Sequence, residues 1–363
     1  MIERIVIQNY KSIRKAQIDL RSINVLIGEN GAGKSNFISF FELVKALYDM
    51  RLTGYMLGNG GIGSQLYHGL KHSNCIKGII DYNNTNAFFF ELKPRQGGEM
   101  AYVSLTGDFF NTYNYKNKDY KSWNKTIWDR DVEESKISEI KYPRAKYIRN
   151  ILESFIVYHF HDTSKTSPMR QLCSIDDNSS LRHDASNLPA VLYKLKEKDT
   201  KAFTLIENTI RAIAPYFKRF KLAPMTLDST KIKLEWEEKD SDMYLDAYSL
   251  SDGTLRFIAL TTLLLQSRLP NTIIIDEPEL GLHPAAITKL SAMIKLASKK
   301  SQIIIASQSV ELINNFSVND LIIVGRDDKQ SIFNRLNEED YSLWLESYSV
   351  GELWDKNILG GRP

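Results

Sequence analysis

The chain has 363 residues, of which 43% are hydrophobic and 25% charged, a balance that predicts a globular protein with a large buried core. Its formal net charge of +3 is too small to indicate nucleic-acid binding by itself, and its two cysteines are too few for a disulfide framework or a zinc site. Because no apolar run is long enough to span a bilayer and the N-terminus does not resemble a signal peptide, we expect a cytoplasmic protein without membrane contact.

The first hundred residues carry strand signals and one strong helix signal. Apolar runs at residues 2–10 and 23–28 predict strands, and the second leads directly into a helix. Five glycines within residues 54–65 predict a mobile loop, and three β-rich runs between residues 78 and 107 predict a small antiparallel sheet. The apolar side chains of the helix recur with helical spacing at Phe37, Phe40, Phe41, Val44 and Leu47.

The remaining chain changes character twice. Residues 108–150 mix tyrosine, tryptophan, lysine and asparagine without a sustained heptad, which indicates an insertion that is not a coiled coil. Helical patterns begin near residue 185, residues 220–238 read as a strand region, and the final third alternates helix and strand, which predicts a largely parallel sheet. We divide the chain into an N-terminal lobe, an insertion, a C-terminal lobe and a tail, at residues 1–107, 108–184, 185–345 and 346–363.

The segment GENGAGKS, residues 28–35, matches the Walker A pattern G-x-x-x-x-G-K-[ST] and lies between a predicted strand and a predicted helix, as that pattern requires. Its glycines let backbone N–H groups face phosphates at the positive end of the helix. Lys34 would bridge the β- and γ-phosphates of ATP, and the Ser35 hydroxyl would bind Mg²⁺. The expected nucleotide-binding residues here are Gly28, Glu29, Asn30, Gly31, Ala32, Gly33, Lys34, Ser35 and Asn36.

The segment TIIIDEP, residues 272–278, is an apolar strand that ends in two carboxylates, as expected at the carboxyl edge of a buried parallel strand. Alone, such an acidic pair is more often a solvated turn. Beside the Walker A pattern it reads as a Walker B motif, in which Asp276 would hold Mg²⁺ and Glu277 would polarise the attacking water.

The stretch YSLSDGTLRF, residues 248–257, places Ser251, Asp252 and Gly253 at the start of a predicted helix. One interpretation is an ordinary N-capped core helix. The order GxxxxGKS, LSxG, hhhhDEP, however, resembles the ABC-type ATPases, in which the signature loop of one subunit faces the γ-phosphate held by another. The resemblance implies that Ser251 and Gly253 complete the site of a partner copy. Asp252 must then point away from the phosphate or pair with a cation, for which Arg256 is the candidate.

The resemblance also assigns two later segments. ELGLHP, residues 279–284, follows the Asp-Glu pair as the D-loop of this family does, and its His283 is either a contact across a dimer or an ordinary surface histidine. In IIIASQSVELI, the place of the usual γ-phosphate-sensing histidine is taken by Gln308, which we assign to catalysis together with Glu277. Glutamine can donate a hydrogen bond but cannot titrate, so we expect slow hydrolysis.

Four other features are less specific. YHFHDTS, residues 158–164, brings two histidines and an aspartate together, and a structural role is favoured over a metal site because no further ligand cluster accompanies them. Gln65 is a candidate, by position only, for the glutamine that links Mg²⁺ to the side domain. The basic and aromatic residues of 113–125 fit nucleic acid, a docking protein or a solvated loop equally well. The apolar tail, residues 351–363, is expected to dock on the protein itself or on a partner, with a disordered terminus as the alternative.

Taken together, the motifs are similar to those of the RecF/SMC-like branch of ABC-type ATPases, in particular the small bacterial AAA ATPases encoded beside a nuclease or toxin in anti-phage systems. The similarity covers residues 1–95 and about 180–340. It implies an α/β P-loop NTPase fold: an ABC-type head with a mixed central sheet, an antiparallel β side layer and an inserted helical and aromatic region. It also implies ATP and Mg²⁺ as ligands and a homodimer or higher oligomer formed through the ATP sites.

Two functions remain open. In one, an Mg-ATPase acts directly on DNA, as in RecF-like repair. In the other, the protein is an ATP-gated regulator of an effector protein, a nuclease or toxin encoded nearby, with DNA or a phage component as the trigger. The sequence carries no nuclease motif, so any cleavage is expected from the partner.

Overall fold

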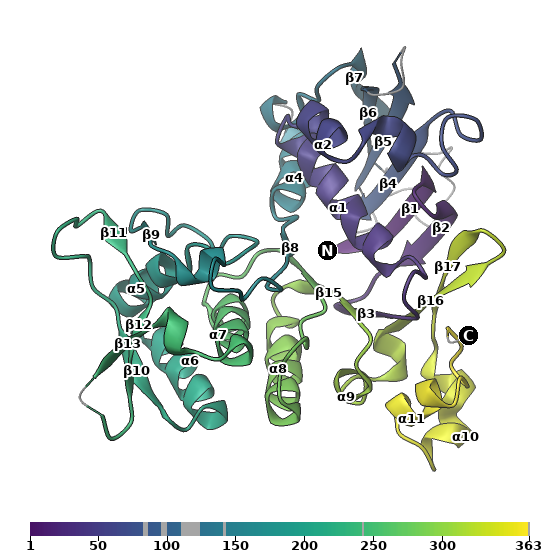
Figure 1. Cartoon of the computed structure of the whole chain (residues 1–363). Helices are drawn as coiled ribbons and strands as arrows, with labels where there is room; N and C mark the ends of the chain where they lie inside the picture. The colour runs from purple at the N-terminus through teal and green to yellow at the C-terminus, as the bar shows by residue number, and fades with distance from the viewer. Residues whose placement is uncertain (83–85, 96–99, 110–123, 141–142, 242, 362–363) are drawn as a thin grey trace.

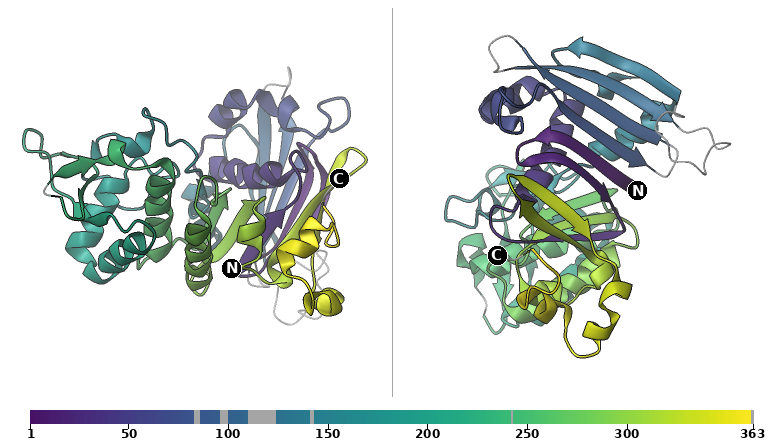
Figure 2. Two further views of the ribbon diagram at one scale, coloured as in Figure 1. Left: turned by 60° about the horizontal axis from the view of Figure 1, so that its bottom comes forward. Right: turned by 90° about the vertical axis from the view of Figure 1, so that its right-hand side faces the viewer.

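The computed structural model of the chain describes residues 1–82, 86–95, 100–109, 124–140, 143–241 and 243–361 (Figures 1 and 2). Its central element is a six-stranded sheet in the order β17-β16-β3-β15-β14-β8, in which β17 is antiparallel to its neighbour and the other pairings are parallel. This mixed sheet confirms the predicted fold class. The strands are β3 (Ile23–Ile27), β8 (Val157–Tyr158), β14 (Thr272–Asp276), β15 (Gln302–Ser307), β16 (Leu321–Asp327) and β17 (Gln330–Arg335).

A second six-stranded sheet, entirely antiparallel, forms the side layer in the order β2-β1-β4-β5-β6-β7. It confirms the predicted antiparallel sheet and is larger than the three strands expected, because two strands at the start of the chain and one from the insertion also belong to it. The strands are β1 (Ile2–Tyr10), β2 (Ile13–Asp19), β4 (Ile76–Tyr82), β5 (Asn86–Pro94), β6 (Ala101–Phe109) and β7 (Asn124–Val132).

Helix α1 (Lys34–Tyr48) fills the space between the two sheets (Figure 1). Alternate residues of the central strands point to opposite faces, so Ile274 joins the apolar core around α1 whereas Ile273 and Ile275 join the core on the other face. The α1 side chains that were predicted to be apolar and regularly spaced are fully buried in the first of these cores. The start of α1, where the Walker A segment ends, is therefore held rigidly by packing.

The glycine-rich segment does not form the mobile loop that its composition predicts. Instead it forms two short helices, α2 (Leu52–Gly58) and α3 (Gly61–Gln65). Burial of Leu52, Met56 and Ile62 anchors them, and the Glu134 carboxylate accepts hydrogen bonds from the first two N–H groups of α2, each at 2.8 Å. Here apolar anchors and a cap outweigh the flexibility of glycine.

The segment that we interpret as an insertion contributes to both sheets. It supplies β7 to the side layer, α4 (Pro143–Glu153) against α1, and β8 to the edge of the central sheet. Most of the basic and aromatic stretch at 113–125 lies outside the described residues.

The helical region predicted from residue 185 and the strand region after it form a separate lobe beside the central sheet (Figure 1). Helix α8 (Pro284–Ala297) packs against α7 of this lobe and so connects it with the central sheet. The helices are α5 (Leu188–Lys198), α6 (Thr200–Ile213) and α7 (Asp252–Leu265), and the strands are β9 (Cys173–Ser174), β10 (Phe217–Lys221), β11 (Lys231–Ile232), β12 (Glu235–Glu238) and β13 (Tyr244–Asp246).

The C-terminal tail docks on the protein itself, which is one of the two docking surfaces expected for it. Leu353 and Leu359 are buried in the core behind the central sheet, and the Gly351 N–H donates to the Asn314 side chain at 2.7 Å. The last helices are α9 (Val310–Ile313), α10 (Ser342–Leu345) and α11 (Val350–Asp355). Within the described part of the chain, no helix is both long and apolar enough to cross a membrane.

Candidate nucleotide site

The Walker A segment forms a tight loop between β3 and α1. The Lys34 ammonium folds back into this loop and donates to the carbonyls of Gly28, at 2.6 Å, and Glu29, at 2.9 Å. Burial lowers the pKa of Lys34, while the carboxylates of Glu277 and Asp276 oppose that shift. The lysine thus lies within electrostatic reach of the acidic residues that follow β14, as a P-loop lysine must if both motifs serve one ligand.

Two hydroxyl groups from distant segments support the loop from behind. Ser331 of β17 donates to the Ala32 carbonyl at 2.5 Å and lies 2.6 Å from the hydroxyl of Ser12, which in turn accepts from Asn36 at 2.7 Å. A side chain at Gly33, whose φ is +119°, would collide with Ser331. Glycine is therefore required at this position for close approach as well as for its backbone conformation.

The carboxyl edge of β14 carries the two predicted acidic residues. Asp276 is the last residue of the strand, and burial raises the pKa of its carboxyl while the neighbouring histidines and Lys34 lower it. Glu277 follows with a φ of +42°, a left-handed conformation that costs a non-glycine residue about 1–2 kcal/mol, and its N–H bonds to the Ala306 carbonyl at 2.9 Å. Such strain is typical of a functional position.

The amide of Gln308 connects the two motifs. Its Nε2 donates to the Asn30 side chain of the Walker A loop at 2.8 Å and to the Glu277 carboxylate at 3.2 Å. The sequence therefore identified a residue that the fold places between the P-loop and the acidic pair.

Glu279 is a neighbouring acid to which the sequence gave no role. Its Oε1 accepts from the Ser307 hydroxyl at 2.6 Å and from the Gln308 N–H at 3.2 Å, and burial raises the pKa of its carboxyl. It fixes the backbone from which the Gln308 side chain projects.

His159 and His161 lie beside Asp276, at the end of β8. The Nε2–H of His159 donates to the Glu42 carboxylate of α1 at 3.1 Å, and its Nδ1 lies 4.0 Å from the Asp276 carboxylate. The His161 ring contacts the Asp276 carbonyl at 2.9 Å. Among the described residues, no group of three or more histidine, cysteine or acidic side chains is arranged to hold a metal ion. The position of the two histidines next to the Walker B strand was not predicted, because it depends on β8 pairing with β14.

The signature segment begins helix α7. Ser251 is its N-cap: its hydroxyl accepts from the Thr254 N–H at 3.2 Å and lies 2.8 Å from the Thr254 hydroxyl. The N-capped helix expected as the simpler interpretation is therefore present. Ser251 and Asp252 are exposed, whereas Gly253 and Thr254 are half-buried. The cap does not exclude a second role, because a serine hydroxyl can accept and donate at once.

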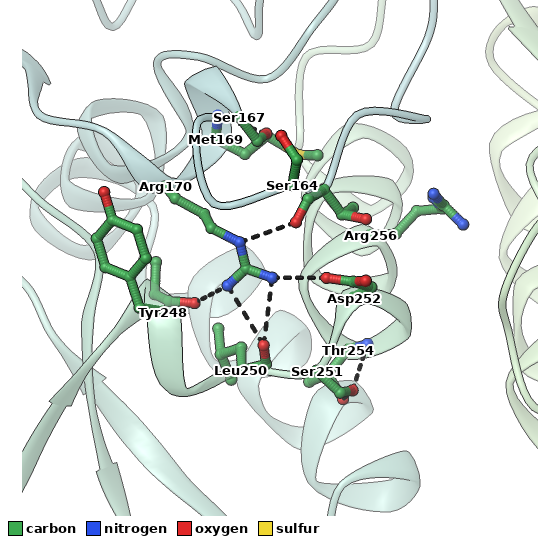
Figure 3. Close-up of polar contacts among 12 residues, drawn as sticks. Ser164, Ser167, Met169, Arg170, Tyr248, Leu250, Ser251, Asp252, Thr254 and Arg256 are labelled. Atoms are coloured by element: carbon green, nitrogen blue, oxygen red, sulfur yellow. Dashed lines mark hydrogen bonds and ion pairs between the residues drawn. The ribbon is translucent and has the colours of Figure 1, made fainter.

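The cation beside Asp252 is not the one we predicted. Asp252 pairs with Arg170 at 2.8 Å (Figure 3), whereas Arg256 points the other way and donates to the carbonyls of Phe160, at 2.7 Å, and Leu280. The two arginines differ because Arg256 lies one turn into α7, on the face that is buried against the D-loop.

The signature helix and the D-loop of the same chain touch through their backbones. A side chain at Gly253 would come within 2.5 Å of the Gly281 carbonyl, so this glycine is required for packing within one chain. His283 caps α8 through an Nδ1 that accepts from the Ala285 N–H at 3.3 Å, and it is exposed. Gln65 is buried in α3, and its amide donates to the Asn59 carbonyl at 2.9 Å.

The residues present fit a magnesium nucleotide. Gly31 has open space where a side chain would point, and the exposed Ser35 hydroxyl and the Asp276 carboxylate provide the oxygen ligands that Mg²⁺ prefers. The first turn of α1 carries no acidic residue, so its positive end is available to an anion.

A family model described as "AAA domain, putative AbiEii toxin, Type IV TA system" matches residues 23–314, most of the chain. The chain belongs to this family. No curated protein matches it significantly.

The fold of this AAA family member is similar to the folds of two solved structures. One is the SmcHead bound to the C-winged helix domain of ScpA, with a TM-score of 0.60 and 15% identity over 94% of this chain and 99% of that one. The other is an Smc head domain with an extended coiled coil bound to the C-terminal domain of ScpA from Pyrococcus furiosus, with a TM-score of 0.56 and 16% identity over 95% and 98% of the two chains. The AAA family member therefore has the fold of an SMC-type P-loop ATPase head, as the sequence motifs predicted.

Proposed function

We propose that this AAA family member binds ATP with Mg²⁺, dimerises through the bound nucleotide and hydrolyses it slowly. We further propose that its nucleotide state regulates a partner effector, a nuclease or toxin, in bacterial anti-phage defence, with DNA or a phage component as the trigger. The observation that carries the proposal is the amide bridge of Gln308 between Asn30 and Glu277.

Each residue of the site has a role in this proposal. Lys34 would leave its two carbonyl partners and place its charge on the β- and γ-phosphates. When bound, Mg²⁺ would neutralise phosphate charge, held through Ser35 and Asp276. Glu277 would orient and polarise the attacking water. Gln308, already between these groups, would donate its amide to the γ-phosphate without supplying positive charge, so it contributes less to stabilising the transition state than an imidazolium would.

The exposed start of the signature helix supports a composite site. The signature helix starts at an exposed N-cap, Ser251, in the lobe beside the central sheet (Figure 1). In a symmetric dimer, Ser251 and the N–H groups of the first turn, including that of Gly253, would face the phosphates held by the other copy. Hydrolysis would separate the copies, so occupancy by ATP would act as the signal.

Partner regulation is proposed from the fold and the family. Two SMC heads of similar fold are bound to a domain of ScpA, and the family is described by a putative toxin of a toxin–antitoxin system. Both support a head that acts together with another protein, which we propose to be the product of a neighbouring gene.

Turnover of the wild type and of Gln308→His tests the proposal. We expect a wild-type rate below the roughly 1–1000 per second typical of enzymes, and a rise on Gln308→His because an imidazole adds charge stabilisation at the γ-phosphate. Gln308→Ala should lose ATP-dependent dimerisation in light scattering, while ATP still binds to the monomer. A fast wild-type rate that is the same in all three proteins would contradict the proposal.

The alternative is a RecF-like ATPase that acts directly on DNA. The same assay with and without double-stranded DNA separates the two functions. Strong stimulation by DNA in the absence of any partner protein favours the repair function, whereas a rate that responds only to the co-purified neighbour favours the regulator.

A further inference from the structure

A buried arginine outside the recognised motifs holds the signature loop. Arg170 ends a short 3-10 helix, Pro168–Arg170, and is 8% exposed. Its guanidinium points at the turn that leads into α7 (Figure 3). No sequence pattern singled out this residue, because it lies 82 positions before Asp252.

All three nitrogens of the guanidinium are engaged. Nε donates to the Thr163 carbonyl at 3.0 Å. Nη1 donates to the carbonyls of Ala247 and, at 3.3 Å, of Leu250. Nη2 donates to the same Leu250 carbonyl at 3.3 Å and to the Asp252 carboxylate at 2.8 Å.

These acceptors are the backbone that sets the start of the signature helix. Ala247 begins the 3-10 turn Ala247–Ser249, and Leu250 follows this turn and directly precedes the N-cap Ser251. A planar fork that binds both carbonyls fixes their direction, which a flexible lysine ammonium cannot do. Arg170 therefore fixes the direction in which Ser251 and the first N–H groups of α7 point.

The contact between Arg170 and Asp252 also compensates the negative charge of the Asp252 carboxylate. Its side chain is 67% exposed in the first turn of α7, where a carboxylate stabilises the helix but repels any phosphate that approaches the same helix end. Arg170 supplies the compensating charge from the buried side and draws the carboxylate toward itself (Figure 3).

The loop that carries Arg170 is itself firmly anchored. The Ser167 hydroxyl donates to the Asp162 carbonyl at 2.6 Å and accepts from the Met169 N–H at 3.3 Å. The loop follows β8 and includes His161, whose ring contacts the carbonyl of Asp276. Arg170 thus lies on an anchored segment that extends to the candidate nucleotide site of its own chain.

We propose that Arg170 is the positioning residue of the signature loop, which orients Ser251 and the N-terminus of α7 and neutralises Asp252 so that this helix end can face the triphosphate of a second copy. The proposal rests on the composite site of the proposed function. It adds a requirement that the LSxG pattern alone does not carry: an acidic residue in this loop needs a buried arginine behind it.

The test uses Arg170→Lys, Asp252→Asn and the double variant, with Arg182→Lys as the matched control because Arg182 forms an exposed pair with Asp177 at 2.6 Å. Hydrogen exchange is followed at the amides of Thr254 and Leu255, which bond to Ser251. ATP affinity of the monomer is measured by calorimetry, and association in AMP-PNP and Mg²⁺ by sedimentation.

We expect Arg170→Lys to speed exchange at both amides and to weaken nucleotide-dependent association, each by about tenfold or more, with unchanged ATP affinity. Asp252→Asn in the Arg170→Lys background should restore part of the association, because the repulsive charge is gone, but not the protection from exchange. The control should match the wild type in all three measurements.

If Arg170→Lys shows the same amide exchange rates and the same association as the wild type, the positioning role is wrong. If Asp252→Asn restores none of the association in the Arg170→Lys background, the proposed charge compensation is wrong. A wild type that does not associate with nucleotide would contradict the composite site itself, and this inference with it. The exchange data distinguish the two failures, because they report loop order without requiring a second copy.

Discussion

The two halves of the candidate ATP site differ in how far apart their parts lie in the sequence. The Walker A loop is one continuous segment whose lysine and glycines act on their immediate neighbours, such as the Lys34 bonds to Gly28 and Glu29. The signature loop depends on Arg170, 77 positions away from its acceptor Ala247, and on the D-loop at Gly281. A motif whose contacts are local can be recognised from the sequence. For a motif that is held in place by tertiary contacts, the sequence shows the motif residues but not the distant residues that support them.

The largest effect is expected from the local half. Lys34→Ala removes the single fixed positive charge within the P-loop, and we expect ATP affinity measured by calorimetry to fall by about a hundredfold or more. Lys45→Ala, on the same helix but paired with Asp49, is the control and should bind ATP normally. Unchanged affinity of Lys34→Ala would contradict the P-loop assignment.

The same difference between local and tertiary contacts determines how much of the site could be predicted from the sequence. Every residue named in the Walker A segment, and Asp276, Glu277 and Gln308, lies at the junction of β3, α1, β14 and β15, because parallel strands bring their carboxyl ends to one edge. Ser12, Ser331 and Arg170 were missed because a lone serine or arginine carries no signal until strands or loops distant in sequence are paired. The cation chosen for Asp252 was wrong for that reason, since the nearer Arg256 in sequence is turned away by helix geometry.

The fold shows where composition misleads. Five glycines predicted a loop at residues 54–65, but buried Leu52, Met56 and Ile62 hold two helices there. The first strand of the chain was recognised as a strand, but its membership in the side sheet follows only from pairing with β4. Local propensity predicted the elements, and long-range burial decided how they assemble.

An intermediate effect, on stability, is expected at the tertiary contact between α7 and the D-loop. Gly253→Ala inserts a methyl group within 2.5 Å of the Gly281 carbonyl, and we expect it to lower the free energy of unfolding by about 1–3 kcal/mol. Gly54→Ala, in a helix with nothing within 4 Å, is the matched control and should raise it by about 0.5–1 kcal/mol. Denaturant unfolding measures both, and equal effects of the two variants would refute the backbone contact between α7 and the D-loop.

The smallest effect concerns the histidine beside Asp276. The hydrogen bond to Glu42 raises the pKa of His159 above its usual 6.5, so the pair stabilises the folded state fully below that value, and this stabilisation is lost as pH rises through the folded-state pKa. Because both side chains are partly exposed, we expect Glu42→Gln to lower stability by about 0.2–1 kcal/mol near pH 6 and by less near pH 8. Asp49→Asn, which breaks a pair without histidine, should show no such difference in thermal unfolding between the two pH values.

The central claim is that the signature loop of one copy completes the site of another, and mixing two defective variants tests it most directly. Lys34→Ala leaves an intact signature loop, and Ser251→Arg leaves an intact P-loop while placing bulk and charge at the helix end that would face the partner. Neither variant alone should associate with ATP and Mg²⁺. We predict that an equal mixture regains ATP-dependent association and hydrolysis, because the mixed dimer contains one intact composite site. A mixture as inactive as its components, with ATP still bound by Ser251→Arg, would contradict the central claim.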